Sequence, residues 1–281
     1  MHLLKWLSKR SEVSKLAGLL GLRRVLKNSY YHWMRPAGAV MPVAVGGVSA
    51  RFYVRTYREL RMLDPVDSGE QTVLDLLVNF LQEGDVFYDI GASFGLYSVL
   101  LAQVVGGRGK VIAFEPETQS RLNLLENLKL NGLANVRCLQ KALGEEPGEV
   151  KLFVSDGSSV PTLLATTSHG GGTPPAPSEM VKVDSGDRLV AEENFPIPRA
   201  VKIDVEGYEH SVIKGLSQTL AQPACELVCC EIHPPSLPAG VDTKSVLDLI
   251  QSLGFTSIDK GGREREDNFY FIARKPDVTT R

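Results

Sequence analysis

The chain has 281 residues, 43% of them hydrophobic and 23% charged, and its formal net charge at pH 7 is −2. This suits one α/β domain with a short appendage. No window approaches the roughly 18 to 20 apolar residues of a membrane-spanning helix. Residues 1–35 carry eight Lys or Arg and one Glu, a net of +7, which leaves −9 for the rest. An acidic body without a basic and aromatic stripe argues against nucleic acid as a partner.

The first 35 residues read as a basic amphipathic segment. Leu and Val recur at near-helical spacing over residues 2–27 with Lys and Arg between them, which predicts one helix, or two broken at Gly18 or Gly21. Such a helix suits the surface of an anionic membrane. It equally suits packing of its leucines on the domain with its charges in water, and the sequence leaves both interpretations open.

Residues 36–68 are expected to form a β-rich extension, with candidate strands at Val43–Val45 and in the alternating run Ala50–Arg55. Residues 69–275 then show the pattern of a single α/β domain, which is where the chemistry is expected. The domain opens with a helix whose apolar face consists of Val73, Leu74, Leu77, Val78 and Leu81.

A Gly-rich turn follows the first strand of this domain, in the sequence DVFYDIGASFG at residues 85–95. An apolar run ends at Asp89, turns at Gly91 and Gly95, and leads into the apolar helical pattern Leu96–Val105. A strand, a Gly-rich turn and a helix in this order are typical of a nucleotide-binding α/β sheet. A tight structural turn would show the same glycines, so the turn alone is a weak signal.

A second acid stands at the spacing that such a sheet requires. Lys110–Phe114 reads as a buried strand and leads into Glu115 and Pro116, where a carboxylate can accept both hydroxyls of a ribose. The turn lacks the middle glycine of a dinucleotide site, and Ser93 and Phe94 would obstruct a pyrophosphate. The sequence therefore favours an adenosyl ligand without phosphate, S-adenosylmethionine.

The rest of the domain alternates helices and strands. Residues 155–180 are rich in Gly, Ser, Thr and Pro and are expected to form a mobile loop or lid. Phe255–Ile258 and Asn268–Ala273 are joined without a helix, so they are expected to be antiparallel. The other expected elements are a helix at 118–130, strands at 136–139, 150–154 and 200–205, a helix containing 212–220, a strand at 226–232 and a helix around 246–253.

These elements predict an α/β fold. The sheet is expected to be doubly wound, Rossmann-like, seven-stranded and mostly parallel, as in class I methyltransferases, and to end in an antiparallel hairpin. The helical and β-rich segments at the N-terminus form an appendage to it.

Several blocks of the domain resemble the FkbM-type S-adenosylmethionine-dependent methyltransferases. The most specific is VKIDVEGYE at Val201–Glu209, whereas the glycine turn is a weaker signal. The resemblance covers roughly residues 70–273 and leaves the first 60 outside. The matching blocks are Gly84–Gly95, Ala113–Pro116, Gln140–Gly144, Val201–Glu209, Val212–Gly215 and Glu231–His233.

The resemblance implies an O-methyltransferase that acts on a hydroxyl of a glycan, glycolipid or natural product. Two positions depart from the family pattern. Ser93 stands where Asn is common, and Ala142 stands where many class I enzymes have an acid for the adenine amino group, so backbone groups and apolar packing are expected to hold adenine. The residues expected to hold the donor are Asp89, Gly91, Ser93, Gly95, Glu115, Pro116, Ala142 and Asp204.

Methyl transfer from a sulfonium requires alignment of donor and acceptor and exclusion of water, and an aliphatic hydroxyl also needs a base or a metal. The groups that serve this are expected after the carboxyl ends of strands. We hypothesise that His233 or the pair Asp204 and Glu206 takes the proton. The titratable residues near these strand ends are Asp204, Glu206, Glu209, His210, Glu231 and His233.

Simpler interpretations of the same residues remain. Glu206 and Glu209 suit the N-terminus of a helix, where acids complement the dipole. His233 suits a loop imidazole bonded to backbone. Hard oxygen ligands at Asp204, Glu206 and Glu231 are compatible with Mg²⁺, but the sequence carries no dedicated metal signature, and no metal is predicted.

Two other functions stay open at this stage. A nicotinamide-dependent oxidoreductase or epimerase shares the sheet, although the chain lacks the third glycine and a Tyr-x-x-x-Lys pair. A non-catalytic scaffold would use residues 1–27 at a membrane, although the intact turn argues against a decayed site. The sequence identifies neither the acceptor nor an oligomeric state.

The cysteines indicate the compartment. The chain has four cysteines, and their spacing is not that of a disulfide framework. The adjacent Cys229 and Cys230 are expected on opposite faces of a strand. A reducing compartment is the simplest inference. We therefore expect a cytoplasmic protein, with peripheral membrane contact through residues 1–27 as an open alternative.

Overall fold

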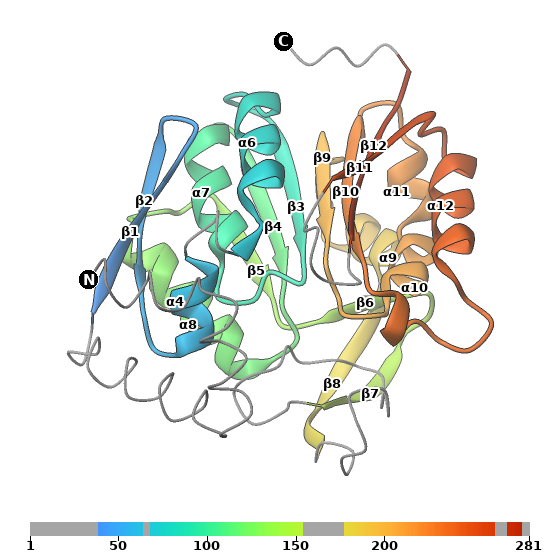
Figure 1. The fold of residues 1–281 in the computed structure, drawn as a ribbon, viewed down its shortest axis with the longest axis horizontal. Helices are drawn as coiled ribbons and strands as arrows, with labels where there is room; N and C mark the ends of the chain where they lie inside the picture. Colours follow the sequence, from blue (N-terminus) through green and yellow to red (C-terminus); the bar gives the residue numbers. More distant parts are fainter. Residues whose placement is uncertain (1–38, 64–67, 154–176, 262–268, 277–281) are drawn as a thin grey trace, which may run out of the picture.

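The structure is a computed structural model that describes residues 39–63, 68–153, 177–261 and 269–276 (Figure 1). The predicted basic helix at 2–27 lies outside the described residues. The predicted lid also lies outside them, up to residue 176.

A seven-stranded sheet forms the centre of the molecule, with the strand order β11-β12-β10-β9-β3-β4-β5 (Figure 1). The strands from β10 to β5 are parallel to their neighbours, whereas β12 is antiparallel to both β10 and β11. This confirms the predicted mostly parallel sheet and its antiparallel hairpin. The strands are β3 Val86–Ile90, β4 Lys110–Phe114, β5 Val136–Leu139, β9 Ala200–Ile203, β10 Leu227–Ile232, β11 Ser257–Gly261 and β12 Phe269–Arg274.

Helices cover both faces of this sheet (Figure 1). On one face, α6, α7 and α8 share an apolar core with Phe87 of β3. On the other face, α9 to α12 share a second core with Tyr88 of the same strand. The helices are α6 Gln71–Phe80, α7 Leu96–Val105, α8 Thr118–Leu130, α9 Gly186–Glu192, α10 Glu209–Gly215, α11 Ser217–Ala221 and α12 Thr243–Ser252.

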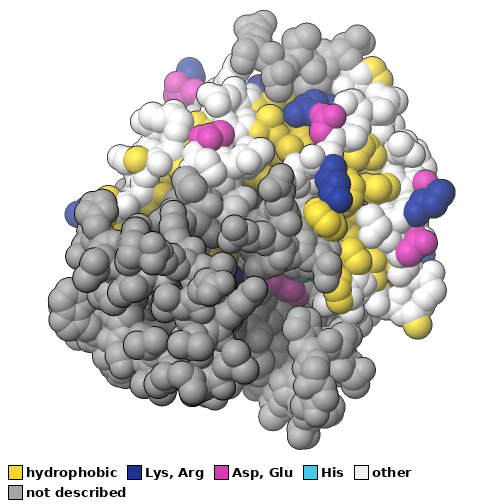
Figure 2. Space-filling model, in the orientation of Figure 1, with side chains coloured by type: hydrophobic (Ala, Val, Ile, Leu, Met, Phe, Trp, Pro, Cys, Tyr) yellow, Lys and Arg dark blue, Asp and Glu magenta, His cyan; other side chains and the backbone are white. Residues whose placement is uncertain are grey.

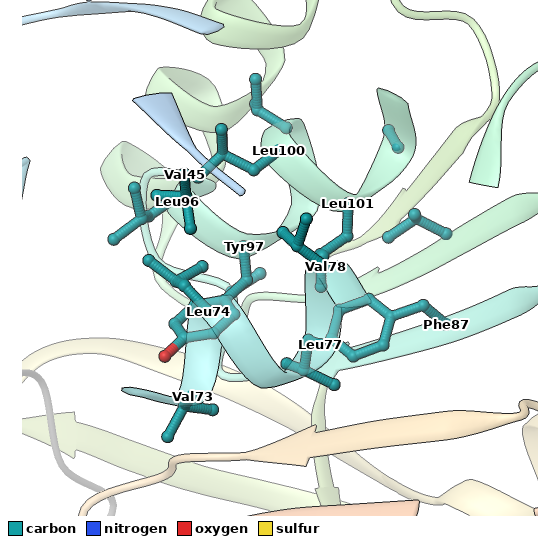
Figure 3. Close-up of a cluster of buried hydrophobic side chains, with 14 of the residues drawn as sticks. Val45, Val73, Leu74, Leu77, Val78, Phe87, Leu96, Tyr97, Leu100 and Leu101 are labelled. Carbon is teal, nitrogen blue, oxygen red and sulfur yellow. The ribbon is translucent and has the colours of Figure 1, made fainter. Parts of the chain in front are cut away.

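The alternation of side chains along the strands explains the two cores. Successive residues of a strand point to opposite faces. Cys229 therefore lies in the first core and Cys230 in the second, as predicted, and all four cysteines are free thiols. Figure 3 shows the first core, where Leu74 and Leu77 of α6 pack against α7 beside Phe87.

A hairpin of β1 (Val40–Val45) and β2 (Val48–Tyr53) packs on the first core. Phe52 is fully buried, and its ring meets that of Phe94 edge to face, with centroids 6.2 Å apart. The side chain of Asn127 on α8 accepts a hydrogen bond from Tyr53 N–H at 3.0 Å, which satisfies a donor at the edge of the hairpin. The two predicted strands of this region are thus confirmed.

A short helix follows the hairpin in the region expected to be β-rich. This helix, α4 (Tyr57–Met62), has Thr56 as its N-cap residue, which forms a capping box with Glu59. The Thr56 hydroxyl accepts from Glu59 N–H at 3.1 Å, and the Glu59 carboxylate accepts from Thr56 N–H at 2.9 Å. These two bonds satisfy donors that an uncapped helix would leave open.

A small separate sheet is the main addition to the predicted fold, because the sequence predicted only one of its strands, at 150–154. It has the order β6-β8-β7, with β6 at Ala142–Gly144, β7 at Gly148–Phe153 and β8 at Pro177–Ser185. The expected loop at 155–180 is therefore wrong at its end, because residues 177–180 belong to β8. Pairing of β8 with both neighbours supplies the backbone hydrogen bonds that a loop would lack.

The helix expected over residues 212–220 is divided into α10 and α11. The break falls at Leu216, next to Gly215, where a Cβ would lie 1.8 Å from the carbonyl oxygen of Gly144. Tertiary contact with β6 thus accompanies the break.

Within the described ranges, no helix has both the length and the apolar character needed to cross a bilayer. Figure 2 shows acidic and basic side chains interspersed with hydrophobic ones over the described part of one face.

Candidate active site

Close backbone contacts shape the Gly-rich turn after β3. Gly91 and Gly95 adopt positive φ angles of 79° and 94°. A Cβ on Gly91 would lie 1.9 Å from the carbonyl oxygen of Asp204, so no side chain fits there. The N–H groups of Gly91 and Ala92 both donate to the carbonyl oxygen of Phe114, at 3.0 and 3.1 Å. The turn is therefore fixed between β4 and β9 at the carboxyl edge of the sheet, where α/β sheets bind ligands.

Glu115 at the end of β4 presents a fixed carboxylate to this turn. Its Oε2 accepts from Ser93 N–H at 2.7 Å, and its Oε1 accepts from Glu117 N–H at 2.8 Å. Burial raises the pKa of the Glu115 carboxyl to about 7, although both backbone donors act to lower it. Each oxygen keeps a second lone pair, so the carboxylate can accept further hydrogen bonds from a ligand.

Asp89 and Lys202 form a buried charged pair below the turn. Asp89 is fully buried; its Oδ2 accepts from the Ser98 hydroxyl at 2.6 Å, and its Oδ1 lies 3.8 Å from Lys202 Nζ. Burial raises the pKa of Asp89, while Lys202 and Ser98 oppose the rise. Lys202 Nζ also donates to Gly91 O at 3.0 Å and lies 3.2 Å from Asp204 Oδ2. This ammonium group thus links the two acids and the turn.

A second group of acids surrounds His233, directly after β10. Its Nε2 lies 3.5 Å from Glu206 Oε2 and 3.7 Å from both Asp204 Oδ1 and Glu231 Oε1. Its Nδ1 lies 2.7 Å from Oε1 of Glu209, a fully buried residue on α10. We call these five residues the His233 cluster. The structure thus brings the four predicted groups Asp204, Glu206, Glu231 and His233 together.

The carboxylates of the His233 cluster determine the protonation of the imidazole. Burial alone lowers the pKa of His233, because His233 is only 2% exposed. The hydrogen bond to Glu209 and the charges of Glu206 and Asp204 outweigh burial and raise the pKa to about 10. The interpretation of His233 as a loop imidazole bonded to backbone does not describe this environment, since its ring nitrogens face carboxylates.

The loop from β9 to α10 holds two of these carboxylates in place. Asp204 N–H donates to Ile90 O at 3.1 Å, which continues the pairing of β9 with β3. Glu206 adopts a positive φ of 54°, and Gly207 one of 104°. A Cβ on Gly207 would lie 2.2 Å from the carbonyl oxygen of Ser236. Strained backbone of this kind persists where the surrounding structure enforces it, often at functional sites.

Three other residues were singled out from the sequence: Pro116 and Ala142 as donor-binding residues, and His210 as a titratable residue near the strand ends. Pro116 follows Glu115 and is half-buried. Ala142 is buried at the start of β6, three residues after Leu139, whose carbonyl oxygen accepts from Glu115 N–H. His210 is not part of the His233 cluster. Its pKa is lowered by burial and by the charge of Lys214.

Sequence reasoning assigned no role to Lys202 and treated Glu209 as a helix-dipole residue. The signal for Lys202 was a single charged residue inside the buried strand Ala200–Ile203, because such a residue is rarely buried unless it is paired. The signal for Glu209 was weaker. Its contact with His233 joins α10 to the end of β10, and no spacing in the sequence reveals that contact.

Comparison with known proteins identifies the family. The profile of the family described as "Methyltransferase FkbM domain" matches residues 89–257. The hexuronic acid methyltransferase AglP of Haloferax volcanii is 31% identical over 227 residues, which cover 80% of this chain and 86% of that protein. The chain belongs to the FkbM methyltransferase family. The 31-O-demethyl-FK506 methyltransferase FkbM of Streptomyces tacrolimicus is 26% identical over 202 residues, covering 63% of this chain and 75% of that protein.

Two solved structures are also similar to this FkbM-family methyltransferase. Methyltransferase FkbM from Methylobacillus flagellatus KT has a TM-score of 0.45 at 18% identity. The match covers 67% of this chain and 43% of that chain. The SAM-dependent methyltransferase from Agrobacterium tumefaciens has a TM-score of 0.48 at 11% identity, covering 87% of this chain and 72% of that chain.

Family membership decides between the functions that the sequence left open. The chain is a methyltransferase, and the FkbM match that the sequence predicted is confirmed. The interpretations as a nicotinamide-dependent oxidoreductase and as a non-catalytic scaffold are set aside. The matched range includes the Gly-rich turn, Glu115 and the His233 cluster.

Proposed function

We propose that this FkbM-family methyltransferase transfers a methyl group from S-adenosylmethionine to a hydroxyl of a sugar within a glycan or glycolipid. The observation that carries the proposal is the 31% identity with a hexuronic acid methyltransferase over 80% of the chain. A hexuronic acid is therefore the first acceptor to test, and a natural-product hydroxyl is the second class, since the other relative is a 31-O-demethyl-FK506 methyltransferase.

The residues at the turn suit an adenosyl donor. Gly91 leaves no space for a side chain, Glu115 presents a fixed carboxylate to ribose hydroxyls, and Asp89 Oδ1 has no hydrogen-bond partner in the described part of the chain. Asp89 and Asp204 are two further acids beside the turn that could bind a ligand ammonium group. When bound, S-adenosylmethionine supplies a methyl group on a positively charged sulfur.

Transfer requires a hydroxyl that loses its proton as it reacts. The acceptor oxygen forms a bond to the methyl carbon while the carbon–sulfur bond breaks, the sulfur keeps the electron pair, and the hydroxyl proton passes to a base. We assign this base to the group of Asp204, Glu206 and His233, where Asp204 borders the turn and the other two lie beside it. Because the pKa of His233 is about 10, its imidazole already carries a proton at neutral pH, so one of the two carboxylates accepts the hydroxyl proton. A base of this kind contributes about 10²- to 10⁴-fold to the rate.

The proposal is tested with the full chain in two steps. Calorimetric titration with S-adenosylhomocysteine and with NAD identifies the donor class. Transfer of labelled methyl groups to hexuronic acid oligosaccharides, with neutral hexose oligosaccharides in parallel, identifies the acceptor. We expect S-adenosylhomocysteine to bind, NAD not to bind, and the label to appear as an O-methyl group on the uronic acid.

Variants then test the base. We expect Glu206→Gln and His233→Asn to lower turnover by about 100-fold or more while S-adenosylhomocysteine binding stays within a few-fold. Asp248→Asn, an exposed change on α12, is the matched control and should retain turnover. Full turnover of either site variant removes that residue from the mechanism. Binding of NAD without S-adenosylhomocysteine, or no label on any hydroxyl acceptor, contradicts the proposed function.

A further inference from the structure

We propose that Asp204, Glu206 and His233 bind a divalent cation, with Glu209 as the residue that orients the imidazole. One ligand atom from each of the three lies within 4.8 Å of the other two. Divalent ions bind oxygen and nitrogen ligands at about 2.0 to 2.4 Å, so neighbouring ligands of one ion stand roughly 2.8 to 3.9 Å apart, and opposite ones up to twice the bond length. The three residues have this spacing.

The distances at His233 favour an ion over direct hydrogen bonds. Nε2 lies 3.5 Å from Glu206 Oε2 and 3.7 Å from Asp204 Oδ1, and Glu231 Oε1 is also 3.7 Å away. All three distances exceed the roughly 2.7 to 3.2 Å of a normal hydrogen bond. They fall within the range for atoms that share one ion. Glu231 therefore borders the site as a further candidate oxygen ligand.

The imidazole is held as metal-binding imidazoles are. A histidine that binds a metal through one nitrogen usually donates its other N–H to a carboxylate, which fixes the tautomer and the ring orientation. Here Glu209 Oε1 lies 2.7 Å from Nδ1, so the proton on Nδ1 is held there and Nε2 faces Asp204 and Glu206. An ion bound at Nε2 would displace the proton that this nitrogen carries without it. Gly207 N–H donates to the same Oε1 at 2.9 Å and keeps the carboxylate in place.

A second, independent observation comes from the other oxygen of Glu209. This residue is fully buried, and within the described residues its Oε2 has no hydrogen-bond partner. A buried carboxylate oxygen without a partner carries a desolvation penalty, and the positive charge of an ion bound through His233 would offset it. Because Glu209 contacts Nδ1, on the ring side away from Asp204 and Glu206, it does not bind the ion and acts as the residue that orients the imidazole.

Asp204 has a separate oxygen for each neighbour. Its Oδ2 lies 3.2 Å from Lys202 Nζ, and its Oδ1 faces His233 Nε2. The ammonium group of Lys202 therefore does not occupy the oxygen that the ion would use. A mixed set of carboxylates and one imidazole suits Mn²⁺, Mg²⁺ or Zn²⁺ and lacks the thiolates that would select softer metals.

The use of the ion rests on the proposed function. An ion beside the turn would coordinate the acceptor hydroxyl and lower its pKa, and the carboxylate oxygen of Glu206 that the ion does not bind would accept the proton before methyl transfer. A sugar offers adjacent oxygens that suit a hard cation. The ion would thus position the acceptor as well as activate it.

The experiment measures the ion itself. The full chain is stripped with EDTA, and Mn²⁺ binding is followed by the loss of the electron paramagnetic resonance signal of free Mn²⁺ and by calorimetry. We expect one Mn²⁺ per chain. Asp204→Asn, Glu206→Gln and His233→Asn should each lower the affinity by tenfold or more. Glu209→Gln should lower it about 10- to 100-fold, the effect typical of an outer partner of a metal ligand.

The metal-binding experiment has a matched control variant, and different results contradict the metal proposal and the proposed function. Asp248→Asn on α12 removes an acid of the same type from an exposed pair with Lys244 and should leave Mn²⁺ affinity unchanged. Circular dichroism and S-adenosylhomocysteine binding on each variant show that it is folded. Wild-type chain that binds Mn²⁺ no better than His233→Asn, or full methyl transfer in excess EDTA, overturns the metal proposal alone. Stoichiometric Mn²⁺ binding without methyl transfer to any hydroxyl supports the metal site and contradicts the proposed function instead.

Discussion

At the residue scale, Glu115 combines a structural and a binding role. Two backbone N–H groups fix its carboxylate, yet burial raises its pKa from 4.5 to about 7. The folded chain therefore binds this proton more tightly than the unfolded chain does. The contribution of Glu115 to stability is greatest below pH 4.5, falls as the pH rises from 4.5 to about 7, and is constant above that.

This pKa gives donor binding a pH dependence of the opposite sign. Ribose hydroxyls donate to the ionised carboxylate, so we expect affinity for S-adenosylhomocysteine to rise between pH 6 and 8, by up to about tenfold per pH unit below the pKa. Glu115→Gln should weaken binding about 10- to 100-fold at pH 8, as expected for lost hydrogen bonds to a charge, and flatten the profile. Calorimetry at three pH values checks this, and an unchanged slope in Glu115→Gln contradicts it.

Alanine substitutions at Gly91 and Gly84 distinguish the energetic cost of backbone strain from that of steric overlap. Both have positive φ, but a Cβ on Gly91 would overlap the Asp204 carbonyl, whereas a Cβ on Gly84 meets nothing within 4 Å. We expect Gly84→Ala to lower the free energy of unfolding by about 1 to 2 kcal/mol, the cost of a left-handed alanine. Gly91→Ala should lower it by about 3 kcal/mol or more and abolish donor binding. Urea denaturation measures both, and equal losses would refute the overlap.

Among single residues, the sequence predicted the acids at the strand ends but not the side chains that contact the site residues. Asp89, Glu115 and Asp204 each end a strand, and that position alone was enough to select them. Lys202 and Glu209 escaped because their roles depend on distances between strands and helices that are remote in the chain. Whether Asp204, Glu206 and His233 act in catalysis stays a prediction.

At the scale of elements, one buried acid connects three of them. Glu70 precedes α6, and its Oε2 accepts from the hydroxyls of Tyr97 on α7 at 2.6 Å and Tyr270 on β12 at 3.0 Å. Burial and the charge of Glu70 raise the pKa of both tyrosines. The network therefore ties both ends of the domain to the core in Figure 3, where Tyr97 is labelled.

We expect this network to matter for stability. Tyr97→Phe and Tyr270→Phe should each lower the free energy of unfolding by about 1.5 to 3 kcal/mol, since each removes a hydrogen bond to a charged group. Tyr88→Phe is the control, because the Tyr88 hydroxyl donates to the neutral Pro196 carbonyl at 2.8 Å, and about 0.5 to 1.5 kcal/mol is expected. A double-mutant cycle should show coupling between Tyr97 and Tyr270. Strict additivity would mean that the two hydroxyls act independently.

Element boundaries were predictable where local signals set them. The helices at Leu96–Val105 and Thr118–Leu130 have the predicted bounds, because a glycine precedes and follows the first, and Glu117 caps the start of the second. The strand predicted at 150–154 corresponds to β7, whereas β6, β8 and their pairing were missed because β8 pairs with β6 and β7 across a long segment. The break between α10 and α11 was missed because it accompanies the contact of Gly215 with Gly144, which no local pattern encodes.

At the scale of the whole molecule, the charge distribution leads to a prediction about membranes. The net charge of residues 1–35 is +7, while the remainder carries −9. If residues 1–27 bind an anionic surface, each Lys or Arg near it contributes about 1 kcal/mol. The full chain should then sediment with anionic vesicles at low salt and be released near 0.5 M salt, where screening shortens the range of charge to well below 10 Å.

A deletion of residues 1–27 and neutral vesicles are the two controls, and both should abolish sedimentation. Binding that persists in high salt, or that the shortened chain retains, would remove the electrostatic explanation. The alternative in which the leucines pack on the domain predicts no sedimentation at any salt concentration.

The architecture as a whole followed from the sequence, but the acceptor did not. The order of strands and the closing hairpin were predictable because hydrophobic periodicity and connection length limit the topologies available. The acceptor depends on loops that follow the strands, and function resides in such sites more than in the fold. A sugar acceptor is therefore proposed from a relative and not from the sheet.

The Asp204 carbonyl packs against Gly91, so the turn proposed to hold the donor and an acid proposed to meet the acceptor share one backbone contact. Packed atoms cannot shift on one side without changing the surface on the other. Occupancy by donor and by acceptor should then be coupled, each changing the affinity of the other by the same factor, as thermodynamic reciprocity requires. Titration of S-adenosylhomocysteine with and without the sugar should accordingly give two different dissociation constants.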